Sequence, residues 1–145
     1  MKEMMMRDIY DTMSWYVHRN DYQKIYDDYL DYTVSFRHTI GDTTYSVYME
    51  TKSFGQVNRV KFSVPRRVPA AKIKEAARVA NELNRKIRFG AFRLVEHNGR
   101  VEYCFDSVLR YGQISTRYFE EVMDLSIRTL ETYAADLVAL CTEDV

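Results

Sequence analysis

The sequence predicts an α+β fold, in which an antiparallel sheet has helices packed on one face. Three observations lead to this class. Apolar residues recur every three to four positions in several long segments, they alternate at every second position in others, and Gly41-Asp42 and Asn98-Gly99 separate alternating segments as hairpin turns do. The predicted order of elements is α-β-β-β-α-β-β-α. Strands joined by tight turns are antiparallel, and such a sheet needs helices on only one face.

The length and composition fit one folded domain. The chain has 145 residues, which predicts a single domain over 1–145. Hydrophobic residues make up 46% and aromatic residues 14%, which argues against disorder. The 21 basic and 21 acidic residues balance, so the chain is neither a polycation nor an acidic tail.

The first elements are a helix and an ambiguous segment. Residues 2–17 carry apolar side chains at helical spacing, which predicts an amphipathic helix. Residues 20–31 also show helical spacing from Tyr22 to Leu30, but their tyrosines and the Asp27-Asp28 pair would suit a short strand and turn as well. We favour a helix or irregular structure here.

A hairpin follows, because the period changes to two from Tyr32 onward. A two-residue type II′ turn at Gly41-Asp42 pairs Ile40 with Thr43. In this register one face of the hairpin is apolar and the other is polar, so turn chemistry and burial agree. The apolar face carries Val34, Phe36, Val47 and Met49.

The next three elements are a strand, a helix and a second hairpin. A turn at Ser53-Phe54-Gly55 leads into a strand over 56–64, and Pro69 suits the first turn of a helix that ends near Lys86. Alternation in residues 92–94 and 101–106 flanks Asn98-Gly99, which predicts a type I′ turn.

The last element is a helix capped by Ser115 or Thr116 and running to about Leu140. Its apolar stripe is wider than one sheet face requires. Two interpretations stay open: the helix packs on the sheet beside the N-terminal helix, or part of the stripe covers a partner subunit.

No residue pattern points to catalysis. The three histidines, His18, His38 and His97, lack the spacing of metal ligands, and no phosphate-binding glycine loop or nucleophile motif occurs. Cys104 and Cys141 are far apart and are interpreted as small buried hydrophobes. We therefore expect no catalytic, cofactor or metal site and no enzyme activity.

The basic residues are concentrated in the middle of the chain. Residues 56–93 contain eleven Lys and Arg but only two Glu, whereas both flanking segments are net acidic. The block either attracts an anionic partner or is a solvated face neutralised by the acidic helices. Candidate partner-binding residues within it are Arg59, Lys61, Arg66 and Arg67.

Two asparagines lie on one face of the helix that follows Pro69. Asparagine is unfavourable inside helices, so Asn81 and Asn84 call for a reason. They either tie the end of the helix to the following strand, or they contribute to a polar pocket or a dimer contact.

The N-terminus lacks the apolar core of a signal peptide, because Arg7 and Asp8 end the first apolar run after three residues. No segment is apolar enough for a transmembrane helix. We expect a cytoplasmic protein without a membrane partner.

Residues 64–140 contain several short motifs. These are Val68-Pro69, Asn81 and Asn84 in an alanine-rich helix, Phe89-Gly90-Ala91-Phe92, Asn98-Gly99, Val101-Glu102-Tyr103 and Leu130-Glu131-Thr132-Tyr133. With these motifs the segment resembles the YbjN family of bacterial proteins. The resemblance implies a fold similar to that of type III secretion chaperones, which are mostly small dimers that bind polypeptides without chemistry. Relatives are linked loosely to sensory transduction or stress regulation, and the tyrosine-rich residues 10–32 depart from the usual family N-terminus.

The leading hypothesis is a non-catalytic protein-binding module that forms a homodimer and has a regulatory or chaperone role. The alternative is a nucleic-acid or anionic-ligand binder that uses the basic 56–93 segment.

Overall fold

The structure is a computed structural model that describes residues 2–28, 31–52, 57–108 and 115–145. Its strands form a six-stranded antiparallel sheet in the order β1-β2-β3-β4-β7-β6 and a two-stranded ribbon of β5 and β8. In chain order the elements are α1 (Lys2–Arg19), β1 (Gln23–Asp28), β2 (Thr33–Ile40), β3 (Thr43–Lys52), β4 (Val57–Ser63), β5 (Arg66–Arg67), a 3-10 turn (Ala70–Lys72), α2 (Ile73–Lys86), β6 (Ala91–Val95), β7 (Arg100–Val108), α3 (Thr116–Tyr133), α4 (Ala135–Val138) and β8 (Glu143–Asp144).

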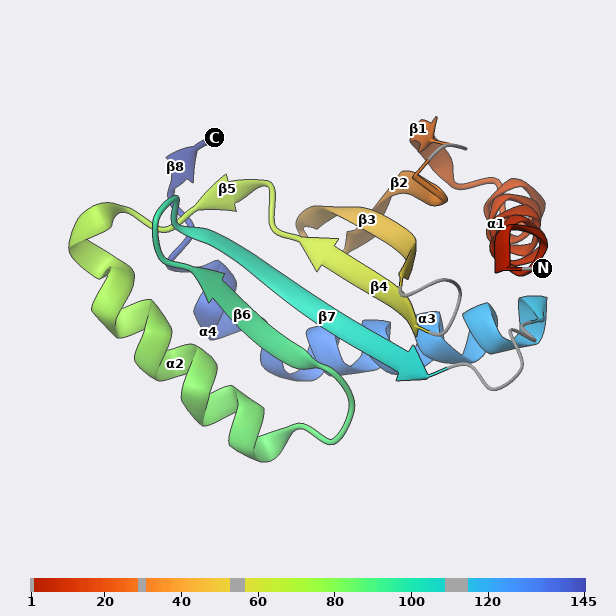
Figure 1. The fold of residues 1–145 in the computed structure, drawn as a ribbon. Helices are drawn as coiled ribbons and strands as arrows, with labels where there is room; N and C mark the ends of the chain where they lie inside the picture. The colour runs from red at the N-terminus through yellow and green to blue at the C-terminus, as the bar shows by residue number, and fades with distance from the viewer. Residues whose placement is uncertain (1, 29–30, 53–56, 109–114) are drawn as a thin grey trace.

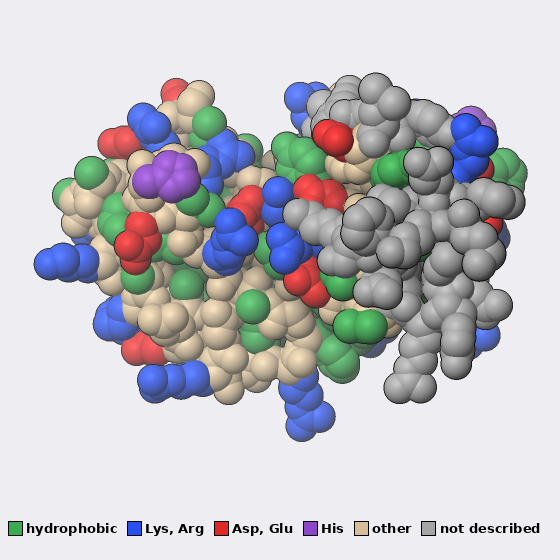
Figure 2. Space-filling view, in the orientation of Figure 1, with side chains coloured by type: hydrophobic (Ala, Val, Ile, Leu, Met, Phe, Trp, Pro, Cys, Tyr) green, Lys and Arg blue, Asp and Glu red, His purple; other side chains and the backbone are tan. Residues whose placement is uncertain are grey.

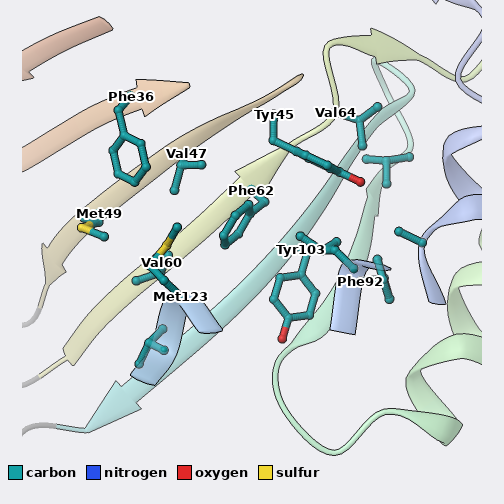
Figure 3. Packing of buried hydrophobic residues seen from close by; sticks show 14 of the residues in the cluster. Phe36, Tyr45, Val47, Met49, Val60, Phe62, Val64, Phe92, Tyr103 and Met123 are labelled. Atoms are coloured by element: carbon teal, nitrogen blue, oxygen red, sulfur yellow. The ribbon is translucent and has the colours of Figure 1, made fainter. Parts of the chain in front are cut away.

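The core lies between one face of the sheet and the helices α1 and α3. Along each strand every second side chain points to the same face of the sheet, and Figure 3 shows apolar side chains of neighbouring strands on that face. In Figure 1, α3 crosses behind the sheet while α2 runs along β6. The predicted α+β class is therefore confirmed. Fully buried members of the core include Ile9, Met13, Val34, Phe36, Val47, Met49, Val60, Phe62, Phe119 and Leu137.

The first hairpin has the predicted register. Ile40 pairs with Thr43 and Val34 with Met49. Gly41 has a φ of +60°, and Asp42 is not among the residues with positive φ, as a type II′ turn requires.

The second hairpin has its predicted alternation but not its predicted turn. Val95 pairs with Arg100, so residues 96–99 form a four-residue connection rather than a two-residue one. The Gly99 N–H donates to the Val95 carbonyl at 2.8 Å, and Gly99 alone in this connection has positive φ, which rules out type I′.

The interpretation of residues 20–31 as helix or irregular structure is wrong for its central part. β1 (Gln23–Asp28) is a strand that pairs with β2, so the sheet gains a strand that the expected element order lacks. The register of this pair shifts between Lys24 and Tyr26. Such a bulge interrupts the two-residue alternation and leaves spacings that resemble a helix. The predicted turn at Ser53-Phe54-Gly55 lies outside the described residues.

The last helix is interrupted before its predicted end. α3 stops at Tyr133, Ala134 separates it from α4, and the chain then forms β8. Ser115 caps α3, as predicted, by accepting a hydrogen bond from the Tyr118 N–H at 3.3 Å. The apolar stripe is directed largely into the core, because its members Phe119, Val122, Met123, Leu130, Ala134 and Leu137 are buried.

Candidate functional site

The sheet face opposite the helices carries acidic and basic side chains that pair with one another. Arg59 donates from Nε and Nη2 to the Asp106 carboxylate at 2.7 and 2.9 Å. The Lys61 Nζ lies 3.5 Å from a Glu102 oxygen and 3.7 Å from a Glu50 oxygen. These pairs arise because β4 lies between β3 and β7 with polar positions in register. Figure 2 shows the mixed charges at the centre of this face.

The pairing changes the electrostatics of the two predicted strand residues. The hydrogen bonding of Arg59 to the Asp106 carboxylate raises the pKa of Arg59 above its usual range. Lys61 also lies over the ring of Tyr48, with Nζ 4.8 Å from the ring centroid. Because each cation has a carboxylate beside it, this face presents little net charge to a phosphate.

Arg66 and Arg67 are paired in the same way, but by the C-terminus. Strand β5 pairs with β8, which brings Arg66 to Asp144 and Arg67 to Glu143, each at 3.4 Å between side-chain N and O atoms. The four predicted basic residues are therefore neutralised by strand and C-terminal carboxylates rather than by the acidic helices that the sequence suggested.

Four cations of the basic block have no ion pair within the described part of the chain. They all lie on α2 or directly after it, whereas the block's other cations lie within 4 Å of a carboxylate. The unpaired positive charge of the block therefore lies at α2 and the residues directly after it, and not on the polar face of the sheet. The four residues are Lys74, Arg85, Lys86 and Arg88.

Asn84 ties α2 to the edge strand β6, whereas Asn81 does not. The Asn84 Nδ2 donates to the Phe92 carbonyl at 2.8 Å, and its Oδ1 accepts from the Phe92 N–H at 2.7 Å. The amide thereby occupies two outward-facing backbone groups of an edge strand. Asn81 is exposed and lines a shallow hollow beside α2, so the structure gives the two residues different surroundings.

A groove of about 290 Å³ lies between the C-terminal end of α2 and the C-terminal half of α3. Its apolar lining comes from both sides: Ile87 and Phe89 from the loop after α2, and Leu125 and Tyr133 from α3. Three cations also line it, Lys86, Arg88 and Arg128. This combination, which we call the α2–α3 groove, is the strongest candidate for a recognition site among the described residues.

The loop that carries Phe89 is fixed by its backbone. The Ile87 N–H donates to the Leu83 carbonyl at 3.1 Å, and the Tyr103 hydroxyl donates to the Phe89 carbonyl at 2.7 Å. Gly90 has a φ of +71°, and a Cβ there would lie 2.6 Å from the Cys104 carbonyl oxygen. Only glycine therefore lets the loop lie this close to β7.

The Phe89 side chain remains accessible although its backbone is anchored. Its ring stacks on Phe105 with centroids 6.2 Å apart and planes at 15°, yet the residue is 42% exposed. A large aromatic side chain held at the surface by a fixed backbone loses little conformational freedom on binding a partner.

Neither cysteine lines this groove. Cys141 is buried in the core, as predicted, whereas Cys104 is only half-buried and lies opposite Lys61 on the neighbouring strand, so its interpretation as a buried residue is wrong. Burial raises the pKa of the Cys141 thiol to about 11 and also raises that of Cys104, so both are protonated near neutral pH. Within the described ranges, no three His, Cys, Asp or Glu side chains are grouped so that they could hold a metal ion. No described helix combines the length and apolar character needed to span a membrane.

The sequence pattern places Lys86 and Arg88 in the basic block but does not connect them with Phe89, Leu125 or Tyr133, which line the same groove. One local feature of the sequence could have indicated the site. A phenylalanine directly follows Arg85-Lys86-Ile87-Arg88, between the end of the predicted helix and the start of the next strand. The contribution of α3 depends on tertiary packing.

The comparisons with known proteins agree with this architecture. A family model described as "Putative bacterial sensory transduction regulator" matches residues 16–138. The chain belongs to the YbjN family. Among solved structures, E. coli YbjN, titled "a putative transcription regulator", matches with a TM-score of 0.67 at 7% identity, over 90% of this chain and 91% of that one. At this identity the YbjN structure supports the fold alone. No curated protein matches the sequence.

Proposed function

We propose that this YbjN-family chain is a non-catalytic regulatory module that binds another polypeptide through the α2–α3 groove. The observation that carries the proposal is Phe89, an exposed aromatic residue on an anchored loop, beside further apolar side chains and unpaired cations. The family's description as a regulator supports the regulatory role. The similarity to type III secretion chaperones that the family resemblance implies would also favour polypeptide binding.

Aromatic and arginine side chains at the centre of a concave patch are the residues that contribute most to protein–protein affinity. The groove has this composition, with Phe89 and Tyr133 beside Arg88 and Arg128. Its volume of about 290 Å³ suits one or two side chains of a partner rather than a whole metabolite with a cofactor.

The alternative function, nucleic-acid or anionic-ligand binding through the basic 56–93 segment, has weaker support. Arg59, Lys61, Arg66 and Arg67 already have carboxylate partners, which a phosphate would have to displace. A binding assay with DNA and RNA at low and high salt tests it, since phosphate contacts predict affinity that falls steeply with salt.

The proposal includes a cytoplasmic homodimer. Strand β1 is at one end of the sheet, and its outer edge is a surface on which a second copy could add a strand. Cys104 and Cys141 are free thiols, as is usual in a reducing compartment. Light scattering over a range of protein concentrations tests the dimer, and a strict monomer at high concentration contradicts it.

Photo-crosslinking in the native cell tests polypeptide binding. A benzophenone amino acid replaces Phe89 in one variant and Trp15, which is 58% exposed on α1, in a matched control. The proposal predicts adducts with a second polypeptide from position 89 that position 15 does not give. No adduct at 89, or the same adducts at both positions, would contradict it.

A further inference from the structure

We infer that the α2–α3 groove receives an acidic segment of the partner polypeptide, which places an apolar side chain against Phe89 and carboxylates against Lys86 and Arg88. The inference rests on the proposed function, because it names the chemistry of the segment that the groove binds.

The charge of the groove favours an acidic occupant. Lys86 and Arg88 line it and have no ion pair within the described part of the chain. The third cation, Arg128, is bound to Asp124 at 2.9 Å, and none of the described residues that line the groove is acidic. A carboxylate entering here meets two uncompensated positive charges without breaking an ion pair inside the protein.

Only one of these two cations lies within the helix. Lys86 is in the last turn of α2, where a positive charge offsets the partial negative charge of the helix C-terminus. Arg88 lies beyond the end of α2, after Ile87, whose extended backbone terminates the helix. Its charge therefore faces the groove without a comparable structural reason.

The apolar lining favours a polypeptide over a nucleic acid. Ile87, Phe89, Leu125 and Tyr133 provide a surface that a phosphate backbone does not use. The other two unpaired cations, Lys74 and Arg85, line a separate hollow of about 660 Å³ along α2. That hollow also contains Glu82 and Glu96, whose carboxylates disfavour phosphates. A continuous basic path for a nucleic acid strand is absent from this described surface.

Calorimetric titration with synthetic peptides tests the inference. The probe peptide alternates Glu with Leu and Phe. Its two controls replace every Glu by Gln, or every Leu and Phe by Ser. At low ionic strength the probe is expected to bind at least about tenfold more tightly than either control. The first control removes the carboxylates that would contact the cations, and the second removes the apolar side chains that would contact Phe89.

Two charge variants locate the binding. The double variant Lys86→Gln/Arg88→Gln is expected to weaken binding of the probe about tenfold. The matched control Lys74→Gln/Arg85→Gln removes the same amount of charge from α2, outside the groove, and is expected to change affinity less than about twofold. Circular dichroism of both variants verifies that α2 is intact.

Equal weakening by both double variants would overturn the inference, since it would mean that only overall charge matters. Absence of probe binding to the wild type would also overturn it, as would tighter binding of a single-stranded oligonucleotide of the same charge. These results are distinguishable from failure of the proposed function. If adducts form at position 89 with a partner that has no acidic segment, polypeptide binding stands and the acidic specificity is refuted.

Discussion

The two hydrogen bonds between Asn84 and Phe92 of β6 can be tested by comparing two alanine substitutions on α2. Asn84→Ala removes the amide that holds both backbone groups of Phe92, whereas Asn81→Ala removes an exposed amide three residues earlier. Both changes replace asparagine by the residue with the highest helix propensity, so the gain in propensity, up to about 0.7 kcal/mol, is common to both. The difference between the variants therefore isolates the tie to Phe92.

The expected magnitude follows from the two hydrogen bonds at 2.7 and 2.8 Å. Each contributes about 0.5–1.5 kcal/mol net, so Asn84→Ala should unfold about 1–3 kcal/mol more easily than Asn81→Ala. Asn84→Asp keeps the acceptor for the Phe92 N–H but places a carboxylate oxygen against the Phe92 carbonyl near the C-terminal end of α2, so it should also be less stable than the wild type.

Urea unfolding followed by circular dichroism measures these differences as shifts in midpoint at constant slope. If Asn84→Ala and Asn81→Ala have the same stability within about 0.5 kcal/mol, the amide does not hold α2 against β6 and the reasoning fails. A changed slope would instead show that a variant alters the folded or unfolded ensemble.

Two further predictions concern other elements. Gly90→Ala should destabilise the fold by about 1–3 kcal/mol more than Gly41→Ala. Both glycines have positive φ, but of the two only Gly90 is so placed that a Cβ would collide, with Tyr103 and Cys104. Thermal unfolding compares the two variants, and an equal loss of stability in both would refute the close approach of Gly90 to β7. Burial lowers the pKa of His38 below its ordinary value of 6.5 in the folded protein. As the pH drops, the His38 imidazole is therefore protonated in the unfolded chain before it is protonated in the folded one. The free energy of unfolding should consequently fall as pH drops from about 6.5 toward the folded pKa. Urea unfolding at several pH values should show a weaker decline for His38→Gln, and identical pH profiles would contradict this.

The sequence predicted the first hairpin to the residue because three local signals agree. The turn at Gly41-Asp42 fixes which residues are opposite each other, and the alternation from Val34 to Met49 separates a buried face from a polar one. A shift of one residue would bury the polar face, so the register has a single good solution.

The sequence could not predict β1 because its pattern is broken by the irregular pairing near Lys24. A short edge strand with such a shift gives apolar spacings of three and four, which periodicity cannot distinguish from a helix. The type I′ prediction failed for a related reason: Asn98-Gly99 marks a turn, but only pairing of Val95 with Arg100 shows that the connection has four residues.

The candidate site was predictable only in its composition. Clustering of basic residues in 56–93 is evident from the sequence, but the partners of Arg66 and Arg67 come from β8, more than seventy residues later. Such pairings depend on tertiary structure, as does the approach of Leu125 to Phe89 across the α2–α3 groove. The sequence therefore located the charge, and the structure shows where it is compensated.

Amide NMR mapping of the acidic, apolar probe peptide tests most directly the claim that the α2–α3 groove, rather than the polar face of the sheet, is the recognition surface. The account predicts that chemical shift changes concentrate at residues 86–89 and 125–133 and leave the strands around Arg59 and Lys61 unchanged. Changes centred on Arg59, Lys61 and their paired carboxylates, with the groove unaffected, would contradict it.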